Sequence, residues 1–344
     1  METKVHRVIL SLKCNKLFML LCFIISSAIP LGFILHLERS LSDSTHVYEY
    51  ASHGWFRDGA KWDDVDRRFL VSYLEGGVGE IKVGDDGDVA EVEEERTIVK
   101  DPDLAGNSSM GLLIDRPRNR LLVVHADVIG NRFGALAAYD LSTWNRVFLT
   151  QLCGPGDGKS LADDVAVDGD GSAYVTDAKG SKIWKVGVHG EVISVITSPL
   201  FSHKGWYKNL VALNGIVYHP NGFLLVVHTT SGALYKVDTK TEEVKLVKVV
   251  GGGSLRLSDG MALVSEREVA VAGVPSGRMV ESRDGWETTE VVGSYRGPAH
   301  RLATAATVKD GKVYLGYMFG SYGFSKRKHV IAQAVFSEKM SGAR

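Results

Sequence analysis

Three aspartates and one asparagine recur at equivalent places in a repeated pattern of this 344-residue chain: Asp58, Asp163, Asn214 and Asp259. Oxygen ligands from carboxylate and amide groups suit a hard cation, Ca²⁺ before Mg²⁺, with water completing the coordination. Carboxylates gathered in one low-dielectric space repel one another strongly unless protons or a cation neutralise them. If the fold brings the four residues together, we therefore predict a site for one Ca²⁺ ion. The alternative is that these residues only satisfy turns before strands.

The repeat that carries these residues is a pair of short apolar strands joined by a tight turn. The second strands are RFLVS (68–72), LLVVH (121–125), AYVTD (173–177), LLVVH (224–228), VAVAG (269–273) and YLGY (314–317). Fourteen residues before the last position of each lie Asp58, Gly111, Asp163, Asn214, Asp259 and Ala303, where the first strands open. Turns such as DGDG and HPNG separate the two strands, as they do in β-hairpins.

Six such units, spaced by 44 to 53 residues, indicate the blades of a propeller. Many units continue with further strands, such as KIWKV (182–186) and EVISVI (191–196), and four strands per unit are typical of a propeller blade. We therefore predict an all-β, six-bladed β-propeller over residues 45–338, followed by a short tail at 339–344. Pairing of HVYEYA (46–51) with HVIAQAVF (329–336) is expected to close the ring. An array of β-sandwich strands is the alternative.

The hairpin geometry also predicts which residues share one mouth of the central channel. The first strand of a hairpin starts at the end where the second strand finishes, so the opening residues lie beside Ser72, His125, Asp177, His228, Gly273 and Tyr317. Of these we predict His125 and His228 as acid/base groups, and Asp177 and Tyr317, together with Asp163, as substrate contacts. Each histidine also has a plainer interpretation as a buried structural group. His219, in the HPNG turn, is expected at the opposite end of its hairpin, far from the site.

The first residues of the chain predict a membrane anchor. Residues 17–35 carry no charge, and a mostly apolar segment of this length can cross a bilayer core of about 30 Å. Because Lys4, Arg7, Lys13 and Lys16 precede this segment, residues 1–16 are expected to stay cytosolic. We predict a signal anchor at 17–36 and a membrane-anchored propeller in the secretory pathway, luminal or extracellular. A cleaved signal peptide is the alternative. Asn107 begins an N-glycosylation sequon, Asn-Ser-Ser.

Charge and cysteine content exclude some classes of protein. The 40 Lys and Arg residues nearly balance the 41 Asp and Glu residues, so no electrostatic footprint for a nucleic acid is present. Cys14 and Cys22 lie in or beside the N-terminal apolar segment, and Cys153 is alone in the rest of the chain. The propeller is therefore expected to fold without an internal disulfide.

Over about residues 50–336 the chain resembles the regucalcin/gluconolactonase family of six-bladed propellers, which is related to paraoxonase-like and strictosidine-synthase-like proteins. The family motif Glu-Gly-Pro-x-Trp matches Asp58-Gly59-Ala60-Lys61-Trp62, and its Asn-Asp pair matches Asp163-Asp164. Its later Asn-Gly and Asp-Gly pairs match Asn214-Gly215 and Asp259-Gly260. Two positions depart from the pattern: Asp58 is one methylene shorter than Glu, and Asp163 replaces Asn, which raises the formal charge of the ligands from −2 to −3.

The resemblance implies a Ca²⁺-dependent hydrolase of a lactone, an ester or a phosphotriester. Asp58, Asn214 and Asp259 would be metal ligands, and Asp163 would be a fourth ligand or would orient the substrate. Asp259 would also serve as general base or nucleophile, with His125 or His228 moving the proton. A non-catalytic, membrane-anchored propeller that binds a ligand or protein partner is one alternative. A strictosidine-synthase-like condensing enzyme is another.

Overall fold

A computed structural model describes residues 46–84, 94–274, 277–321 and 326–338. Contacts divide the chain into two units, 1–44 and 45–344, and all described residues belong to the second. The predicted cytosolic segment, the anchor and the tail at 339–344 lie outside the described residues. None of the helices within the described ranges has the length and apolar character needed to span a bilayer.

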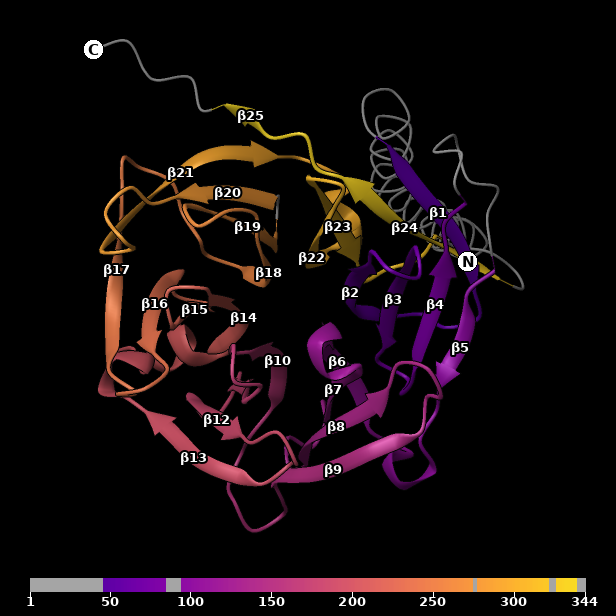
Figure 1. Ribbon diagram of the computed structural model, residues 1–344. Coiled ribbons are helices and arrows are strands. Elements are labelled where there is room, and N and C mark those ends of the chain that lie inside the picture. The colour runs from indigo at the N-terminus through magenta and orange to yellow at the C-terminus, as the bar shows by residue number, and fades with distance from the viewer. Residues whose placement is uncertain (1–45, 85–93, 275–276, 322–325, 339–344) are drawn as a thin grey trace, which may run out of the picture. The chain divides into compact units, whose positions relative to one another are not determined.

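The described residues form six four-stranded antiparallel blades arranged in a ring (Figure 1). Blade 1 contains β2 (Arg57–Asp63), β3 (Arg68–Tyr73), β4 (Val78–Lys82) and β5 (Arg96–Val99). Blade 2 contains β6 (Ser108–Asp115), β7 (Arg120–Ala126), β8 (Gly134–Asp140) and β9 (Arg146–Cys153). Blade 3 contains β10 (Ala162–Val167), β11 (Ala173–Asp177), β12 (Lys182–Val186) and β13 (Val192–Thr197).

The second half of the ring repeats this order. Blade 4 contains β14 (Leu213–His219), β15 (Phe223–His228), β16 (Ala233–Asp238) and β17 (Val244–Val250). Blade 5 contains β18 (Ser258–Leu263), β19 (Glu268–Gly273), β20 (Gly277–Glu281) and β21 (Thr288–Tyr295). Blade 6 contains β22 (Ala303–Lys309), β23 (Lys312–Tyr317), β24 (Arg327–Gln333) and β1 (Val47–Ser52). Short 3₁₀ turns lie at Pro102–Leu104, Arg116–Arg118, Pro199–Phe201, Trp206–Asn209 and Ala299–Arg301.

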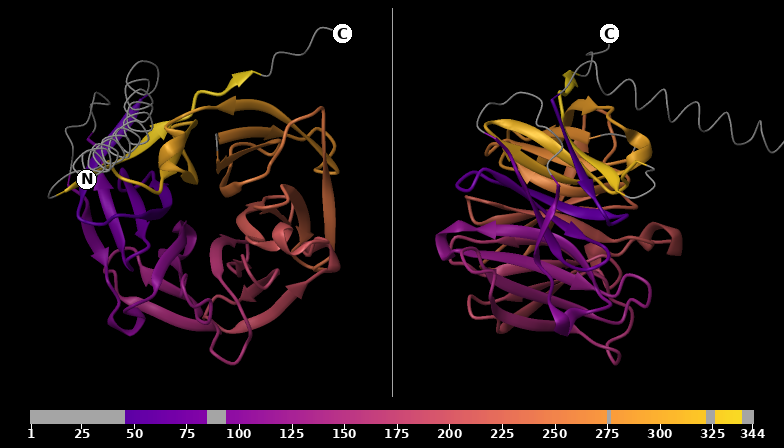
Figure 2. Two further views of the ribbon diagram at one scale, coloured as in Figure 1. Left: turned by 180° about the vertical axis from the view of Figure 1, so that it is seen from behind. Right: turned by 90° about the vertical axis from the view of Figure 1, so that its right-hand side faces the viewer.

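The first strand of every blade faces the centre of the ring. Among these inner strands β2 contacts β6 and β22, β10 contacts β6 and β14, and β18 contacts β14 and β22, so the six close on themselves around a channel. Figure 2 shows the same ring from behind and edge-on. The predicted six-bladed architecture is therefore present in the described residues, and the channel is the one place where all six blades meet.

The ring closes as the sequence predicts. Strand β1 pairs antiparallel with β24, from Val47 opposite Ala332 to Ser52 opposite Arg327. The N-terminal strand thus becomes the outermost strand of blade 6. One further connection was not predicted: the outer strands β17 and β21 pair in parallel, with Lys248 opposite Thr288, and join blades 4 and 5 into one sheet. The two-residue strand β25 (Ser337–Glu338) adds to β21.

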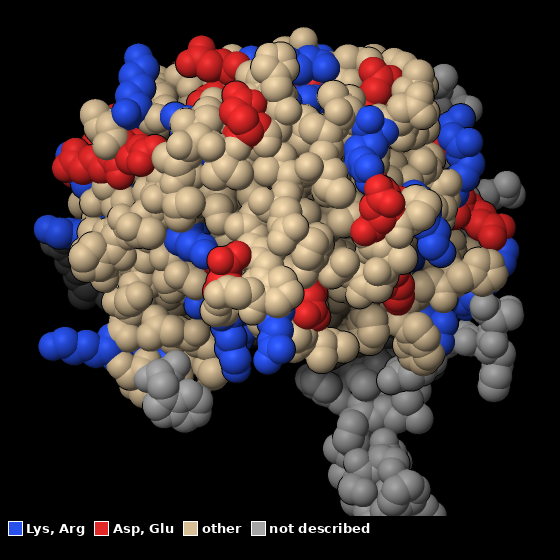
Figure 3. Space-filling model, turned by 90° about the horizontal axis from the view of Figure 1, so that it is seen from below, with Lys and Arg blue, Asp and Glu red and all other residues tan. Residues whose placement is uncertain are grey.

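The hydrophobic core lies between the blades rather than in a single centre. In β7, Leu122 and Val124 pack against blade 3, whereas Leu121 and Val123 pack against blade 1. Both faces of the strand are buried, which explains why the sequence shows continuous apolar runs instead of strict alternation. On the side of the ring in Figure 3, acidic and basic side chains are interspersed among other residues.

Candidate functional site in the central channel

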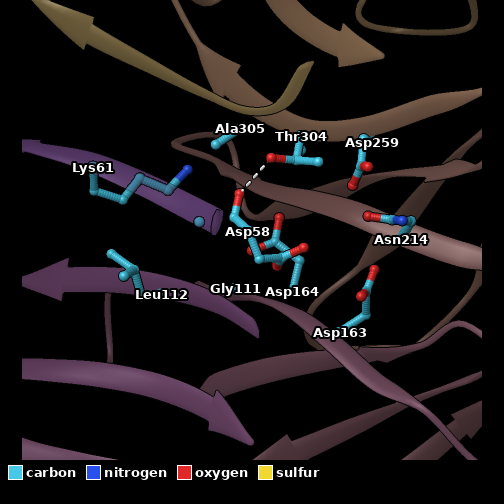
Figure 4. Close-up of a pocket in the computed structure, with 12 residues that line it drawn as sticks. Asp58, Lys61, Gly111, Leu112, Asp163, Asp164, Asn214, Asp259, Thr304 and Ala305 are labelled. Atoms are coloured by element: carbon cyan, nitrogen blue, oxygen red, sulfur yellow. Dashed lines mark hydrogen bonds between the residues drawn. The ribbon is translucent and has the colours of Figure 1, made fainter. Parts of the chain in front are cut away.

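One end of the channel contains a cavity of about 20 Å³, enough for about one water molecule or ion. The four predicted ligands Asp58, Asp163, Asn214 and Asp259 all line it, and they come from blades 1, 3, 4 and 5 (Figure 4). The rest of the lining is Gly59, Lys61, Gly111, Leu112, Asp164, Gly260, Thr304 and Ala305. We call this cavity the acidic chamber. The four predicted ligands come from positions as far apart as Asp58 and Asp259, and their roles as ligands remain predictions.

A break in strand register points these side chains at the channel. In β2, Arg57 pairs with Tyr73 and Ala60 with Val71, so Asp58 and Gly59 lie at a shift between regular pairs. The same shift occurs at Asp163-Asp164, Asn214-Gly215 and Asp259-Gly260. Such irregularities are common next to functional sites because they redirect a side chain out of the pleat. The bulge therefore sets the direction of all four predicted ligands.

Glycine follows three of these four residues because neighbouring inner strands approach closely there. A β-carbon on Gly260 would lie 2.6 Å from the Thr304 carbonyl oxygen in the next blade, and one on Gly215 would clash with the Asp259 carbonyl oxygen. The X-Gly pairs thus reflect packing at the axis of the ring. Blade 3 carries Asp164 instead. Its carboxylate accepts hydrogen bonds from the backbone amides of Val165 at 2.9 Å and Ile216 at 3.3 Å, which ties blade 3 to blade 4.

Burial and mutual repulsion disfavour the ionised form of the carboxyl groups of the chamber. Burial raises the pKa of Asp58 and of Asp163 well above the ordinary value, and the neighbouring aspartates raise it further. The pKa of Asp259 rises to about 7, chiefly through burial and then through the charge of Asp164. Burial also raises the pKa of Asp164, although the nearby ammonium of Lys61 acts in the opposite direction. The chamber is therefore a place where negative charge is costly and a cation would be stabilised.

Lys61 supplies a positive charge at the same chamber. Its ammonium donates hydrogen bonds to the carbonyl oxygens of Ala306 at 3.2 Å and Met261 at 3.3 Å. Burial lowers the pKa of Lys61, and Asp164 opposes that change. The sequence analysis assigned no role to Lys61 or Asp164. Lys61 lies three residues after Asp58, and Asp164 lies directly after Asp163. Their closeness to the predicted ligands was the feature of the sequence that could have identified them.

The donor chemistry of the chamber suits a hard cation, and the present side-chain positions do not yet form a cage. The donors are oxygens only, and Asp163 Oδ2 is buried without a hydrogen-bond partner. As the side chains stand, however, no three Asp, Glu, His or Cys residues within the described ranges form a group that could hold a metal ion. A shared ion would require these side chains to rearrange from their present positions.

The sixth blade contributes a different residue from the one expected. The fixed fourteen-residue spacing points to Ala303, whereas Thr304 and Ala305 line the chamber. The reason is a shorter register shift: Ala303 pairs with Tyr317 and Ala305 with Gly316, so one residue rather than two is displaced. Thr304 Oγ1 donates a hydrogen bond of 2.8 Å to the Asp58 carbonyl oxygen (Figure 4). This bond closes the ring between blades 6 and 1 beside the first predicted ligand.

The two predicted acid/base histidines do not line the acidic chamber. His125 is buried, with its Nδ1 3.2 Å from Ser109 Oγ, and His228 is buried with its ring against His203. Burial lowers the pKa of each to about 4, so both are neutral near pH 7. The Nε2 atom of each is buried without a hydrogen-bond partner. Their predicted part in proton transfer stays a prediction.

Asp177 is held by its own loop. Its carboxylate accepts hydrogen bonds from Ser160 Oγ at 2.5 Å and from the Leu161 and Gly180 amides at 2.9 and 2.6 Å. These bonds hold the Asp177 carboxylate in its loop, and its predicted contact with a substrate stays a prediction. Tyr317 is buried, and burial raises the pKa of its hydroxyl. Neither residue lines the acidic chamber.

His219 ends strand β14, at the far end of the strand from Asn214. Its Nε2 lies 2.8 Å from the Glu266 carbonyl oxygen and its Nδ1 accepts the Asn221 amide at 3.1 Å. This residue stabilises a turn, as its position in the hairpin predicts. Asn107, the predicted glycosylation site, is partly exposed directly before β6.

Comparisons with known proteins identify the fold and no closer relationship. No protein family model matches the sequence, and no curated protein matches it. Among solved structures, the major allergen Mala s 1 of Malassezia sympodialis aligns with a TM-score of 0.61 at 15% identity, over 84% of this chain and 96% of that one. A luciferin-regenerating enzyme aligns with a TM-score of 0.56 at 12% identity, over 86% and 97% of the two chains.

A catalytically inactive virginiamycin B lyase from Staphylococcus aureus aligns with a TM-score of 0.51 at 10% identity, over 85% of this chain and all of that one. These likenesses show that the chain shares the β-propeller fold with proteins that include enzymes. Because a propeller supports many functions, the activity has to be argued from the site.

Proposed function

We propose that the acidic chamber binds one Ca²⁺ ion and that the protein is a metal-dependent hydrolase of a lactone or related ester. The observation that carries the proposal is the meeting of four carboxyl groups and one amide, from four different blades, around one ion-sized cavity. Asp58, Asp163, Asn214 and Asp259 would hold the ion. When bound, Ca²⁺ would polarise the carbonyl oxygen of the substrate and lower the pKa of a water molecule.

Side chains of this protein would contribute ligands for the ion, a group that exchanges a proton and a carboxylate that supports the ligands. Asn214 offers a neutral oxygen between the charged ligands, and Asp163 offers an oxygen that no protein group uses. Asp259, with its pKa raised to about 7, is poised to take up or release a proton near neutral pH. Asp164 is already held by two backbone amides, so it would support the ligand shell rather than join it.

A second candidate is a propeller that binds a ligand without metal or catalysis. Two observations favour it: no metal-holding group exists in the present side-chain positions of the described residues, and Lys61 already supplies a positive charge beside Asp164. In that case, protonation of the carboxyl groups and the positive charge of Lys61 would offset the negative charge of the chamber without a metal ion. Membrane anchoring and a luminal or extracellular location belong to both candidates as proposals.

A calcium titration separates the two candidates. The full-length protein is stripped with EGTA and titrated with Ca²⁺ while thermal unfolding and hydrolysis of a lactone are measured. A ligand at a hundred times its Kd stabilises a protein by about 2.7 kcal/mol, so a bound ion should raise the Tm measurably and start turnover. Stabilisation without turnover supports a structural ion. No response to Ca²⁺ would contradict the hydrolase proposal.

Two asparagine variants of blade 1 sharpen this test. Asp58→Asn removes the negative charge of a proposed ligand, and Asp64→Asn removes an exposed carboxylate from the turn at the other end of the same hairpin. The Ca²⁺-dependent rise in Tm and the turnover should be reduced in Asp58→Asn and unchanged in Asp64→Asn. An equal response of both variants would mean that Ca²⁺ acts elsewhere.

A further inference from the structure

The channel contains a second cavity beyond the acidic chamber. Its volume is about 300 Å³, at the lower end of the range for small-molecule sites. All six inner strands line it through their later residues, among them Leu113, Val167, Tyr218, Leu263 and Val308. We call this cavity the apolar chamber, because aliphatic and aromatic side chains make up most of its wall.

Lys61 lies in the wall of both chambers. Among the residues that the structure describes, it is the only charged one that lines the apolar chamber. An ammonium has three hydrogens to donate. Two of them reach the carbonyl oxygens of Met261 and Ala306, which leaves one for a further acceptor. A lysine ammonium at the inner boundary of an apolar cavity is costly unless its donors are used. This arrangement therefore favours a ligand that brings one acceptor to Lys61.

We propose that the apolar chamber binds an uncharged, apolar molecule that carries one carbonyl oxygen, and that this oxygen accepts a hydrogen bond from Lys61. The proposal is independent of the chemistry proposed for the acidic chamber. Lining residues such as Val167 and Leu263 would contact the hydrocarbon part. Because about 20 Å³ is enough for one water molecule in the acidic chamber, the apolar chamber has room for a molecule of about ten or more heavy atoms.

Charge selects the class of ligand. The positive charge of Lys61 disfavours a cationic head group. The four carboxyl groups of the acidic chamber lie on the other side of Lys61, and they disfavour a ligand that would bring a further negative charge to Lys61 (Figure 4). A carbonyl group satisfies the remaining hydrogen of Lys61 without adding charge. A ketone or ester is thus expected to bind better than a carboxylate or an amine with the same chain.

Calorimetric titration of the full-length protein with four nine-carbon compounds tests this order. The compounds are 2-nonanone, nonane, nonanoate and nonylamine, each measured in EGTA and in Ca²⁺. We expect 2-nonanone to bind tightest, by about tenfold over nonane, because of one hydrogen bond to a charged donor. Its affinity should be the same in EGTA and Ca²⁺. No binding of 2-nonanone, or tighter binding of nonanoate or nonylamine, would overturn the proposal.

Two variants with matched controls locate the ligand. Lys61→Met keeps an unbranched side chain but removes the ammonium, so it should weaken binding of 2-nonanone about tenfold while leaving the affinity for nonane within about twofold. Val167→Trp fills the chamber and should abolish binding of both. The controls are Lys185→Met, which removes a lysine bonded to the Thr239 carbonyl oxygen away from the channel, and Val147→Trp on the exposed strand β9. An unchanged affinity in Lys61→Met or Val167→Trp, or an equal loss in the controls, would refute the assignment.

Discussion

Replacing Asp259 with asparagine is expected to stabilise the protein when no divalent cation is present. Burial and the charge of Asp164 raise the pKa of Asp259 from 3.8 to about 7. At 1.36 kcal/mol for each pKa unit, ionising this group near neutral pH costs the folded state up to about 4 kcal/mol. Asparagine carries no charge and keeps a polar group of the same size beside Asn214. The variant should therefore gain most of this free energy at pH 7.

The pH dependence gives the sign of the effect. Because the pKa of Asp259 is higher in the folded state than in the unfolded one, the folded state takes up the proton first as the pH falls. The cost is complete above pH 7 and disappears as the pH falls through about 3.8. At pH 5 the gain from Asp259→Asn should be reduced to about 2 kcal/mol or less.

Urea unfolding in EGTA at pH 5 and pH 7 measures this difference. The difference in unfolding free energy between the variant and the wild type at each pH cancels the contributions of titrating groups that do not interact with Asp259. The charge of Asp259 raises the pKa of Asp58 and of Asp163, so its removal also relieves these two groups and adds to the gain. Asp64→Asn serves as the control and should change stability by less than about 0.5 kcal/mol at either pH. The reasoning is refuted if Asp259→Asn is no more stable than the wild type at pH 7, or if its gain does not shrink as the pH falls.

Three further outcomes follow from the geometry. Gly260→Ala should destabilise the protein by about 3 kcal/mol, because its β-carbon would lie 2.6 Å from the Thr304 carbonyl oxygen. Gly156→Ala, with no heavy atom within 4 Å, should change little in a urea melt; equal losses would contradict the close approach at the axis. Burial lowers the pKa of His125 to about 4, so protonation of the unfolded state should cost the wild type stability as the pH falls below 6.5. His125→Gln should remove that loss, which is about 1.4 kcal/mol for each pH unit. If the unfolding free energies of the wild type and the variant change in parallel with pH, the explanation is wrong. Asp259→Ala should abolish lactone turnover while His219→Ala, at the far end of its hairpin, leaves it near normal; equal loss in both would show that the polarity of the hairpins is wrong.

The sequence predicts the ring well because blades are local units. Each hairpin can be recognised from two apolar runs that are separated by a tight turn. The closing strand at 46–51 and its partner at 329–336 show the same strand pattern, and they pair in the structure. The fixed spacing also brings Asp58, Asp163, Asn214 and Asp259 to one end of the channel, where they line one cavity. These features depend only on strand period and hairpin polarity.

Other features depend on the local strand register and on side-chain length, which the spacing of residues in the sequence does not reveal. The register shift in blade 6 displaces one residue instead of two, which puts Thr304 rather than Ala303 at the chamber. The same kind of local geometry leaves His125 and His228 outside the lining, although each lies at or next to the end of its strand as expected. Lys61 was missed because its long side chain reaches the channel axis and bonds to backbone carbonyls of two other blades.

The claim on which the proposed function depends is that oxygens from separate blades share one cation. A crystal structure of the EGTA-stripped protein grown with Ca²⁺, with anomalous difference density calculated at the channel, tests it directly. We predict one peak in the acidic chamber, at about 2.3–2.6 Å from oxygens of Asp58, Asp163, Asn214 and Asp259. A chamber without a peak, or a single peak bound elsewhere on the propeller, would contradict the claim.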